Sequence, residues 1–348
     1  MAQRAEEFSA RLTGLFDITV CYRERGHGRA ALAFLRRLIA TSPDLCCVFD
    51  HSLDAVIAAH LYKVARGTRW ILDTGDDIVA LGQALGRGPI AMGVTRRLES
   101  IGYASAAHVV VRGRGHLDAL RTRVRNTTWI PDGVDLKQFR FDPGQSPADP
   151  SLTSPLVIGL VGSSVWSHVR QTCYGQDLIE LVHLLRKSEA VGVPVRGELV
   201  GDGSGIPVLE RQCAELGIAD AITFHGRKPY AELPAIVNRW HLCLSTQTND
   251  AVGAVRTTGK LPLYLAMGRV VLASRVGEAS RVLPDHMLVD YEGSSDRDYA
   301  ARLAARAIAL LRDGAPFRCE AHSVYIATRH FDYDRLAERY AELFAALI

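Results

Sequence analysis

Apolar and amphipathic stretches alternate along the first part of the chain. Apolar residues at helical spacing predict helices over 4–15, 29–39, 53–65, 91–101 and 116–122. Short apolar runs between them predict strands over 17–22, 45–49, 70–72, 107–111 and 128–130. Strands that alternate with helices indicate a parallel sheet covered by helices on both faces.

A proline-rich stretch separates this pattern from a second one like it. Residues 139–150 contain Pro143, Pro147 and Pro150 beside glycine and serine, a composition typical of a linker. We therefore expect two domains, 1–148 and 149–348. The second domain shows the same alternation, with strands over 156–161, 195–200, 222–225, 242–245 and 269–274, and helices over 175–187, 206–216, 230–238, 299–311 and 333–347.

The predicted architecture is therefore two Rossmann-like parallel-sheet domains that face each other across a cleft, with a shortened first domain. Ligands of open α/β sheets bind at the C-terminal edges of the strands, which would line this cleft. The closing helix, about 330–348, can pack back onto the first domain.

Composition narrows the class of protein. The net charge is only +3 and no run of lysine and arginine forms a stripe, so nucleic acid is not indicated as a partner. Neither a signal peptide nor a membrane span is indicated, so we expect a cytoplasmic protein. The seven cysteines are scattered without a C-x-x-C pair, which favours reduced thiols over zinc or disulfides.

One segment combines several groups that bind phosphate. Arg256, Thr257, Thr258, Gly259 and Lys260 precede an apolar helical run. Hydroxyls, free backbone N–H groups and cations at a helix N-terminus suit a phosphate or diphosphate. The structural alternative is a solvated helix start.

Loops after predicted strands of the second domain carry further candidates. Gly162, Ser163 and Ser164 offer hydroxyls and backbone N–H groups to a phosphate, or form a tight turn. Gly201 and Asp202 can contact a base or ribose, and Arg227 can lie beside a nucleobase. Loop charges are, however, common on any surface.

The order of these segments resembles that of a known family. Ile130 to Asp135 reads I-P-D-G-V-D, His225-Gly226-Arg227 precedes Glu232-Leu233-Pro234, and Lys260 to Gly268 reads K-L-x-x-Y-L-A-x-G. With Gly201-Asp202-Gly203 and the tail from His330, these segments are similar to those of GT-B glycosyltransferases of the retaining family 4 type. The resemblance is strong over 130–348 and loose over 17–130.

The resemblance implies a function and a mode of binding. The second domain would hold a nucleotide-diphosphate sugar, and the first a small-molecule, lipid-linked or carrier-bound acceptor. No bound metal or other cofactor is expected, so Arg256, Lys260 and helix N-termini would neutralise the leaving diphosphate. Transfer would retain the sugar's configuration.

The chain departs from the family pattern at several positions. Asp250 lies nearest to the first of two expected donor-site glutamates, and Leu263 occupies the second position, for which Glu278 can compensate. Arg170 can replace the basic residues expected near Gly162. The opening strand of the first domain and its histidine are missing, which leaves His51, Asp73 and Asp76 as polar groups at strand ends.

These arguments predict a site and leave three hypotheses. Asp250, Arg256, Lys260 and His51 are the catalytic candidates, and the donor-binding candidates are Gly162, Ser163, Ser164, Arg170, Gly201, Asp202, Arg227, Thr257, Thr258, Gly259 and Glu278. The leading hypothesis is a retaining glycosyltransferase. The alternatives are a non-catalytic GT-B remnant that serves as a partner or scaffold, and a nucleotide-sugar epimerase or cyclitol-coupling enzyme. A peripheral membrane contact or a homodimer stays open.

Overall fold

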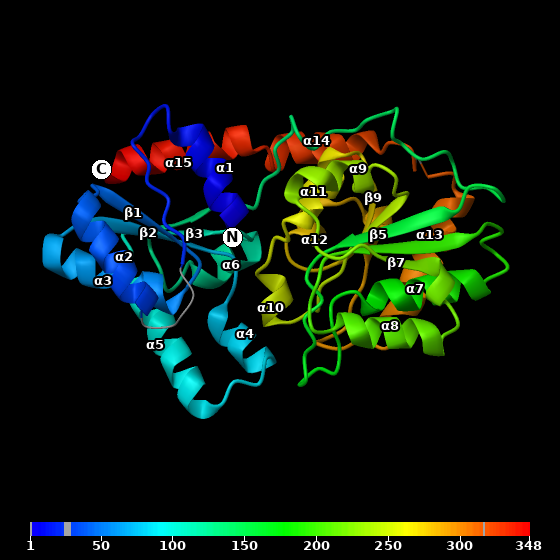
Figure 1. Ribbon diagram of the computed structural model, residues 1–348, viewed down its shortest axis with the longest axis horizontal. Coiled ribbons are helices and arrows are strands. Elements are labelled where there is room, and N and C mark those ends of the chain that lie inside the picture. Colours follow the sequence, from blue (N-terminus) through cyan, green and yellow to red (C-terminus); the bar gives the residue numbers. More distant parts are fainter. Residues whose placement is uncertain (1, 24–28, 316) are drawn as a thin grey trace. The chain divides into compact units, whose positions relative to one another are not determined.

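The structure, a computed structural model, describes residues 2–23, 29–315 and 317–348 (Figure 1). The chain forms two compact units. The N-terminal unit comprises Met1–Gly133, Ala254–Thr257 and Asp332–Ile348, and the C-terminal unit comprises Val134–Gly253 and Thr258–Phe331. The first break lies at Gly133, ahead of the predicted boundary at 148/149, because Val134 and Phe139 are buried in the core of the C-terminal unit.

The N-terminal unit contains a four-stranded parallel sheet. Its strands follow the order of the chain, β1 (Leu45–Phe49), β2 (Arg69–Thr74), β3 (His108–Val111) and β4 (Thr127–Trp129). Its helices are α1 (Ala2–Leu12), α2 (Arg29–Thr41), α3 (Leu53–Arg66), α4 (Ile78–Ala84), α5 (Pro89–Ser105), α6 (Arg114–Leu120) and α15 (Tyr333–Leu347).

Helices cover both faces of this sheet because successive strand residues point to opposite sides. Trp70 and Leu72 of β2 pack with α3 and α5, whereas Ile71 packs with α1 and α15. The first and last helices of the chain therefore lie side by side on one face (Figure 1). The two ends of the chain complete the core of the same unit.

The predicted strand over 17–22 is wrong. Residues 17–23 form no regular structure, and Val20 and Tyr22 are exposed. Their apolar pattern is that of a strand, but no neighbouring strand pairs with them. The other four strands predicted in this half of the chain are confirmed.

The C-terminal unit contains a six-stranded parallel sheet with the order β10-β9-β8-β5-β6-β7. The strands are β5 (Leu156–Val161), β6 (Val195–Val200), β7 (Ile222–Phe224), β8 (Leu242–Ser245), β9 (Val270–Ser274) and β10 (Leu288–Val289). The helices are α7 (Gln176–Lys187), α8 (Ile206–Glu215), α9 (Leu233–Val237), α10 (Ala251–Ala254), α11 (Lys260–Ala266), α12 (Ala279–Val282), α13 (Tyr299–Arg312) and α14 (Ala321–His330).

The two neighbours of β5 in the sheet come from different parts of the chain. The crossover through α7 leads to β6 on one side, and β8 later pairs with β5 on the other. Since parallel crossovers are right-handed, this reversal places helices on both faces of the sheet. Both units thus have the predicted parallel α/β architecture. No helix of the described residues is long and apolar enough to cross a membrane.

Candidate functional site

The C-terminal unit has one topological switch point, between β5 and β8. Open α/β sheets bind ligands in the crevice beyond the carboxyl ends of the strands at such a point. The loops that follow β5 and β8 begin at Gly162 and Thr246. The loop after β5 contains predicted site residues Gly162 to Ser164, and the loop after β8 contains Asp250.

The loops after β5 and β6 are held together by backbone hydrogen bonds. The Gly162 N–H donates to the carbonyl of Val200 at 2.9 Å, and the Ser164 N–H donates to that of Asp202 at 2.8 Å. A Cβ atom on Gly201 would lie 1.8 Å from the Gly162 oxygen, so only glycine allows this approach. Two N–H groups that the sequence offered to a phosphate are therefore engaged, and the Ser163 and Ser164 hydroxyls are the better candidates.

Buried oxygen atoms without a hydrogen-bond partner gather in the segments that follow the switch-point strands. Within the described residues these include the Ser164 hydroxyl, the Tyr174 hydroxyl and the side-chain carbonyl of Gln247. Such a group costs about 1–3 kcal/mol when it is left unpaired, so native proteins rarely keep several together without a ligand or water. Sequence reasoning missed Tyr174 and Gln247, because only the fold shows that their oxygens are buried.

Two predicted residues form an ion pair at the same sheet edge. Arg170 lies 2.6 Å from Asp250 Oδ2 and donates to the Thr248 hydroxyl at 3.2 Å. Asp250 Oδ1 accepts the N–H groups of Val252 and Gly253 at the start of α10. Asp250 therefore also stabilises the turn that leads into α10.

Asp177 is an acidic residue in the first turn of α7. Burial raises the pKa of Asp177 to about 6, although its hydrogen bond with Thr246 opposes the rise. Helix α7 begins after Gly175, whose φ of 111° suits glycine, and no side chain caps it. The N-terminus of α7 and a proton-binding carboxyl group thus lie beside β8.

Lys260 contacts an aromatic ring. Its ammonium group lies 3.5 Å from the centre of the Tyr174 ring, and burial lowers the pKa of Lys260 well below its usual value. The neighbouring Thr258 hydroxyl lies 3.3 Å from that of Ser245, and Gly259 has helical dihedral angles. A nearby anion would oppose this effect, since an opposite charge raises a lysine pKa.

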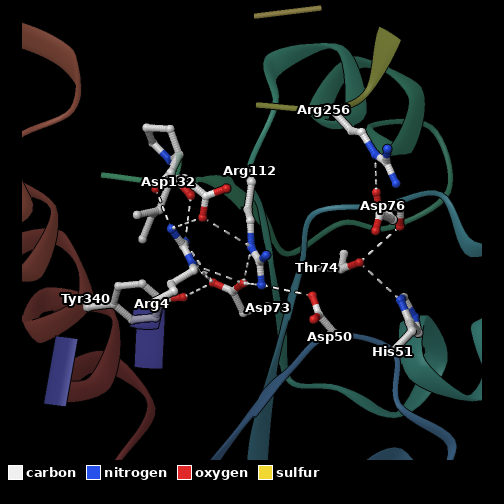
Figure 2. Close-up of polar contacts among 12 residues, drawn as sticks. Arg4, Asp50, His51, Asp73, Thr74, Asp76, Arg112, Asp132, Arg256 and Tyr340 are labelled. Carbon is white, nitrogen blue, oxygen red and sulfur yellow. Dashed lines mark hydrogen bonds and ion pairs between the residues drawn. The ribbon is translucent and has the colours of Figure 1, made fainter. Parts of the chain in front are cut away.

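The predicted phosphate segment is divided between the two units. Arg256 and Thr257 belong to the N-terminal unit, and Thr258, Gly259 and Lys260 belong to the C-terminal unit. Arg256 pairs with Asp76 at 2.5 Å (Figure 2). The Thr257 hydroxyl donates to the Arg112 carbonyl at 2.5 Å. In this structure Arg256 therefore has a carboxylate partner of its own.

The remaining donor candidates are dispersed. Arg227 is exposed after β7, which lies two strands from the switch point. Glu278, which follows β9, is only 1% exposed. The Asp202 carbonyl accepts a hydrogen bond from the Ser164 N–H. Leu263 is buried in the core, so its position offers no place for a ribose hydroxyl.

A buried ion cluster occupies the corresponding sheet edge of the N-terminal unit (Figure 2). Asp73 is the next-to-last residue of β2 and is 0% exposed. Arg4 lies 2.8 Å and Arg112 2.7 Å from its carboxylate, and the Tyr340 hydroxyl also donates to it. Burial alone would raise the pKa of Asp73, but Arg4 and Arg112 lower it below its usual value. Asp73 is thus shielded from a substrate.

Asp50 is the accessible acid of this cluster, and sequence reasoning missed it. Its side chain is 29% exposed and lies 2.9 Å from Arg112. Its φ of 68° is unusual for a residue other than glycine. Burial raises the pKa of Asp50 to about 6 against the opposing effect of Arg112. Strained backbone and a shifted pKa are both features of functional residues.

His51 is enclosed beside this cluster. Its Nδ1 lies 3.3 Å from the Thr74 hydroxyl, and a Cβ atom on Gly102 would lie 2.6 Å from its Nε2. Burial lowers the pKa of His51 to about 3. A catalytic base must reach the proton that it abstracts. The side chain of His51 points into α5, which favours a packing role.

Comparisons with known proteins identify the fold. A scan of protein-family models and a search of curated proteins each found no match. Among solved structures, sucrose-phosphate synthase from Thermosynechococcus elongatus matches with a TM-score of 0.71 at 18% identity, over 95% of this chain and 81% of that one. Anabaena HepE, in complex with UDP and glucose, matches with a TM-score of 0.69 at 16% identity, over 91% and 82%.

A glycosyltransferase from Rickettsia africae matches with a TM-score of 0.65 at 14% identity, over 95% of this chain and 84% of that one. The three matches each span both units. At such identities the likeness establishes the fold. The chain has the two-domain α/β fold of GT-B glycosyltransferases.

Proposed function

We propose that the chain is a glycosyltransferase that takes a sugar from a nucleotide-diphosphate sugar. The observation that carries the proposal is the switch point between β5 and β8, where Arg170, Asp250 and three unpartnered oxygens lie on the adjoining segments. A sugar nucleotide supplies the hydroxyls and anionic oxygens that such a set would bind. Complexes of HepE with UDP-glucose and with UDP and glucose support this choice of ligand.

The residues of the C-terminal unit suit the departure of a diphosphate. Arg170 would turn from Asp250 toward the phosphates, and Lys260 would offer them a second positive charge. The N-terminus of α7 adds partial positive charge. Charge that neutralises the leaving group as its bond breaks lowers the transition state. Asp250 would then accept hydrogen bonds from the sugar.

We propose further that transfer retains the configuration of the sugar. The acceptor hydroxyl would form its bond to the anomeric carbon on the face from which the diphosphate leaves. The proton of the acceptor hydroxyl would pass to the leaving phosphate oxygen, and no protein base is then needed. The enclosure of His51 agrees with this route. The acceptor would be a small molecule or a lipid-linked or carrier-bound group, held by the N-terminal unit.

A panel of UDP-, GDP-, ADP- and TDP-sugars tests donor binding by thermal shift. A ligand at 100 times its dissociation constant adds about 2.7 kcal/mol to stability. We expect one nucleotide to stabilise the protein, and Arg170→Ala to abolish the shift. The control Arg211→Ala removes an exposed arginine from α8 and should leave the shift intact. No shift with any nucleotide would refute the proposal.

A non-catalytic remnant is the second candidate. Leu263 and the four-stranded sheet of the N-terminal unit favour it. Replacing Leu263 with glutamate is a poor test, because the charge would enter the core. Product analysis is better: a remnant that binds UDP-glucose releases no UDP with any acceptor, an epimerase converts the donor without an acceptor, and a transferase or cyclitol-coupling enzyme requires one.

A further inference from the structure

The ring of Tyr174 lies where three segments of the C-terminal unit meet. Tyr174 comes two residues before the start of α7, and its side chain packs on the core of the unit. A Cβ atom on Gly162 would lie 2.7 Å from Tyr174 Cε1, so the ring lies against the backbone of the loop after β5. The ammonium group of Lys260, at the start of α11, lies 3.5 Å from the centre of the ring. The ring thus connects the loop after β5 with α11.

A second contact fixes the start of α11 at the same place. The Tyr264 hydroxyl of α11 accepts a hydrogen bond of 2.7 Å from the N–H of Val161, the last residue of β5. Residues four apart in a helix are neighbours on one face, so Lys260 and Tyr264 lie on the same side of α11. Tyr264 is fully buried, and its hydrogen bond therefore holds this side of α11 against the end of β5.

The Lys260 ammonium has an aromatic partner and, in the described part of the chain, no acidic one. An aromatic ring attracts a cation through its quadrupole but carries no net charge. The Tyr174 ring therefore holds Lys260 without neutralising it. Arg170 differs, because the Asp250 carboxylate lies 2.6 Å from it. Of these two cations, Lys260 is the one whose charge is uncompensated.

A partly buried cation without a counter-ion favours an anionic ligand, because it is costly to bury an unpaired charge. We propose that Tyr174 is the positioning residue for Lys260, and that its ring holds the ammonium group beside the loop after β5 to receive the diphosphate of the donor. The inference rests on the proposed function for its ligand and adds the residue that fixes the place of this cation. A side chain that is ordered before the ligand arrives loses less entropy on binding, which strengthens the complex.

The alternative is that Tyr174 only fills space beneath the loop after β5. Its ring would then act on the loop, and the charge of Lys260 would not matter to the effect of replacing Tyr174. A positioning role requires the opposite, because the ring then acts through the ammonium group. The two roles are therefore separated by measuring the effect of the ring with the ammonium group present and with it removed.

Calorimetric titration of the full chain with inorganic pyrophosphate and with UDP-glucose tests the proposal. Tyr174→Phe and Tyr174→Leu both lack the hydroxyl group, so the comparison between them isolates the aromatic ring. We expect Tyr174→Leu to bind each probe about 5- to 30-fold more weakly than Tyr174→Phe, the effect of losing a partly desolvated cation–π contact.

Lys260→Met provides the background without the ammonium group. In this background Tyr174→Phe and Tyr174→Leu should bind each probe equally, because the ring has no cation to hold. The control Tyr325→Leu makes the same change at an exposed tyrosine of α14 and should leave binding unaltered. Circular dichroism verifies that every variant is folded.

The outcomes separate this inference from the proposed function. If the wild type binds a probe but Tyr174→Phe and Tyr174→Leu bind it equally, the inference is overturned and the proposed function stands. The same factor between the two variants with and without Lys260 would also overturn it, because Tyr174 would then act on the loop.

Pyrophosphate and UDP-glucose distinguish the remaining cases. Binding of pyrophosphate but of no sugar nucleotide would refute the proposed donor, and the comparison on pyrophosphate would still decide the role of Tyr174. Binding of neither probe to the wild type would overturn the inference, and the wider panel of sugar nucleotides would then decide the proposed function by itself.

Discussion

Asp73 illustrates how burial changes the role of a strand-end acid. Arg4 and Arg112 are both buried against its carboxylate. Asp73→Asn therefore removes the negative charge that lies between these two buried guanidinium groups. We expect the free energy of unfolding to fall by about 3–5 kcal/mol, the usual effect of breaking a buried ion pair. Urea denaturation measures it.

The control for Asp73 is a neighbouring acid in a more exposed pair. Asp76 pairs with Arg256, and their side chains are 27% and 35% exposed. Asp76→Asn should cost less than about 1 kcal/mol, because water screens such pairs. Similar effects of the two variants would show that the Asp73 cluster does not stabilise the fold as we describe.

The raised pKa of Asp177 predicts that the stability of the protein depends on pH. Its pKa is raised to about 6 in the folded state, against about 3.9 for an unfolded chain. The folded state then binds the proton more tightly, so this group's contribution to stability falls as pH rises from about 4 to 6. Asp177→Asn should raise the free energy of unfolding at pH 7.5 by about 2–3 kcal/mol and leave it unchanged near pH 4.

Urea denaturation across that pH range checks the prediction for Asp177. Glu210→Gln, an exposed change on α8, is the control and should run parallel to the wild type. Parallel profiles for Asp177→Asn and the wild type would mean that Asp177 ionises normally in the folded chain.

The sequence could identify the candidate site residues that lie at or near the ends of strands. Glycines and polar residues after predicted strands pointed to Gly162 in the second domain and to His51 and Asp73 in the first, and the family resemblance pointed to Asp250. Their partners could not be predicted. Arg4 and Tyr340 reach Asp73 from opposite ends of the chain, and no local pattern records such a contact. The direction of the His51 ring likewise depends on the packing of α5.

At the level of elements, the close approach of the β5 and β6 loops makes a sharp prediction. Gly201 has a φ of 147°, and a Cβ atom there would meet the Gly162 carbonyl. Gly201→Ala should lower the free energy of unfolding by about 4 kcal/mol, from steric overlap and backbone strain together. It should also weaken nucleotide binding, because Gly162 and Ser164 move.

Gly192→Ala separates strain from overlap. Gly192 also has a positive φ, of 64°, but no atom would meet the added Cβ within 4 Å. We expect a cost of only about 1–2 kcal/mol and normal nucleotide binding. If both alanine variants were equally stable, the two loops would not pack as closely as described. Denaturation and thermal shift measure both effects.

Long elements were predicted better than short ones. Helices such as α3 and α7 have enough turns for apolar periodicity to show. The helices α10 and α12 have four residues each, too few for a period, and α14 was also missed. The expected helix over 230–238 is a 3-10 turn followed by α9, with Pro234 near the start of α9. The strand expected over 17–22 failed because pairing, not propensity, makes a strand.

The whole molecule consists of two units with separate cores, and the chain does not divide between them in sequence order. Helix α15, at the C-terminus, contributes Tyr333, Leu336 and Tyr340 to the core shared with α1. The sequence predicts a closing helix over about 330–348 that can pack back onto the first domain. Contacts between residues far apart in sequence decide membership of a unit, which explains why linker composition alone gave a later boundary.

Separate cores predict two calorimetric transitions, since cooperative unfolding is a property of a single core. Tyr340→Ala removes a fully buried ring from the N-terminal unit and should lower one transition temperature by roughly 10 °C. Leu303→Ala removes a buried side chain of α13 and should lower the other by a similar amount. A nucleotide that binds at the switch point should raise only the transition that Leu303→Ala lowers. If both variants shifted one common transition, the two units would unfold as a single cooperative structure, and the assignment of the donor to one unit would need evidence other than calorimetry.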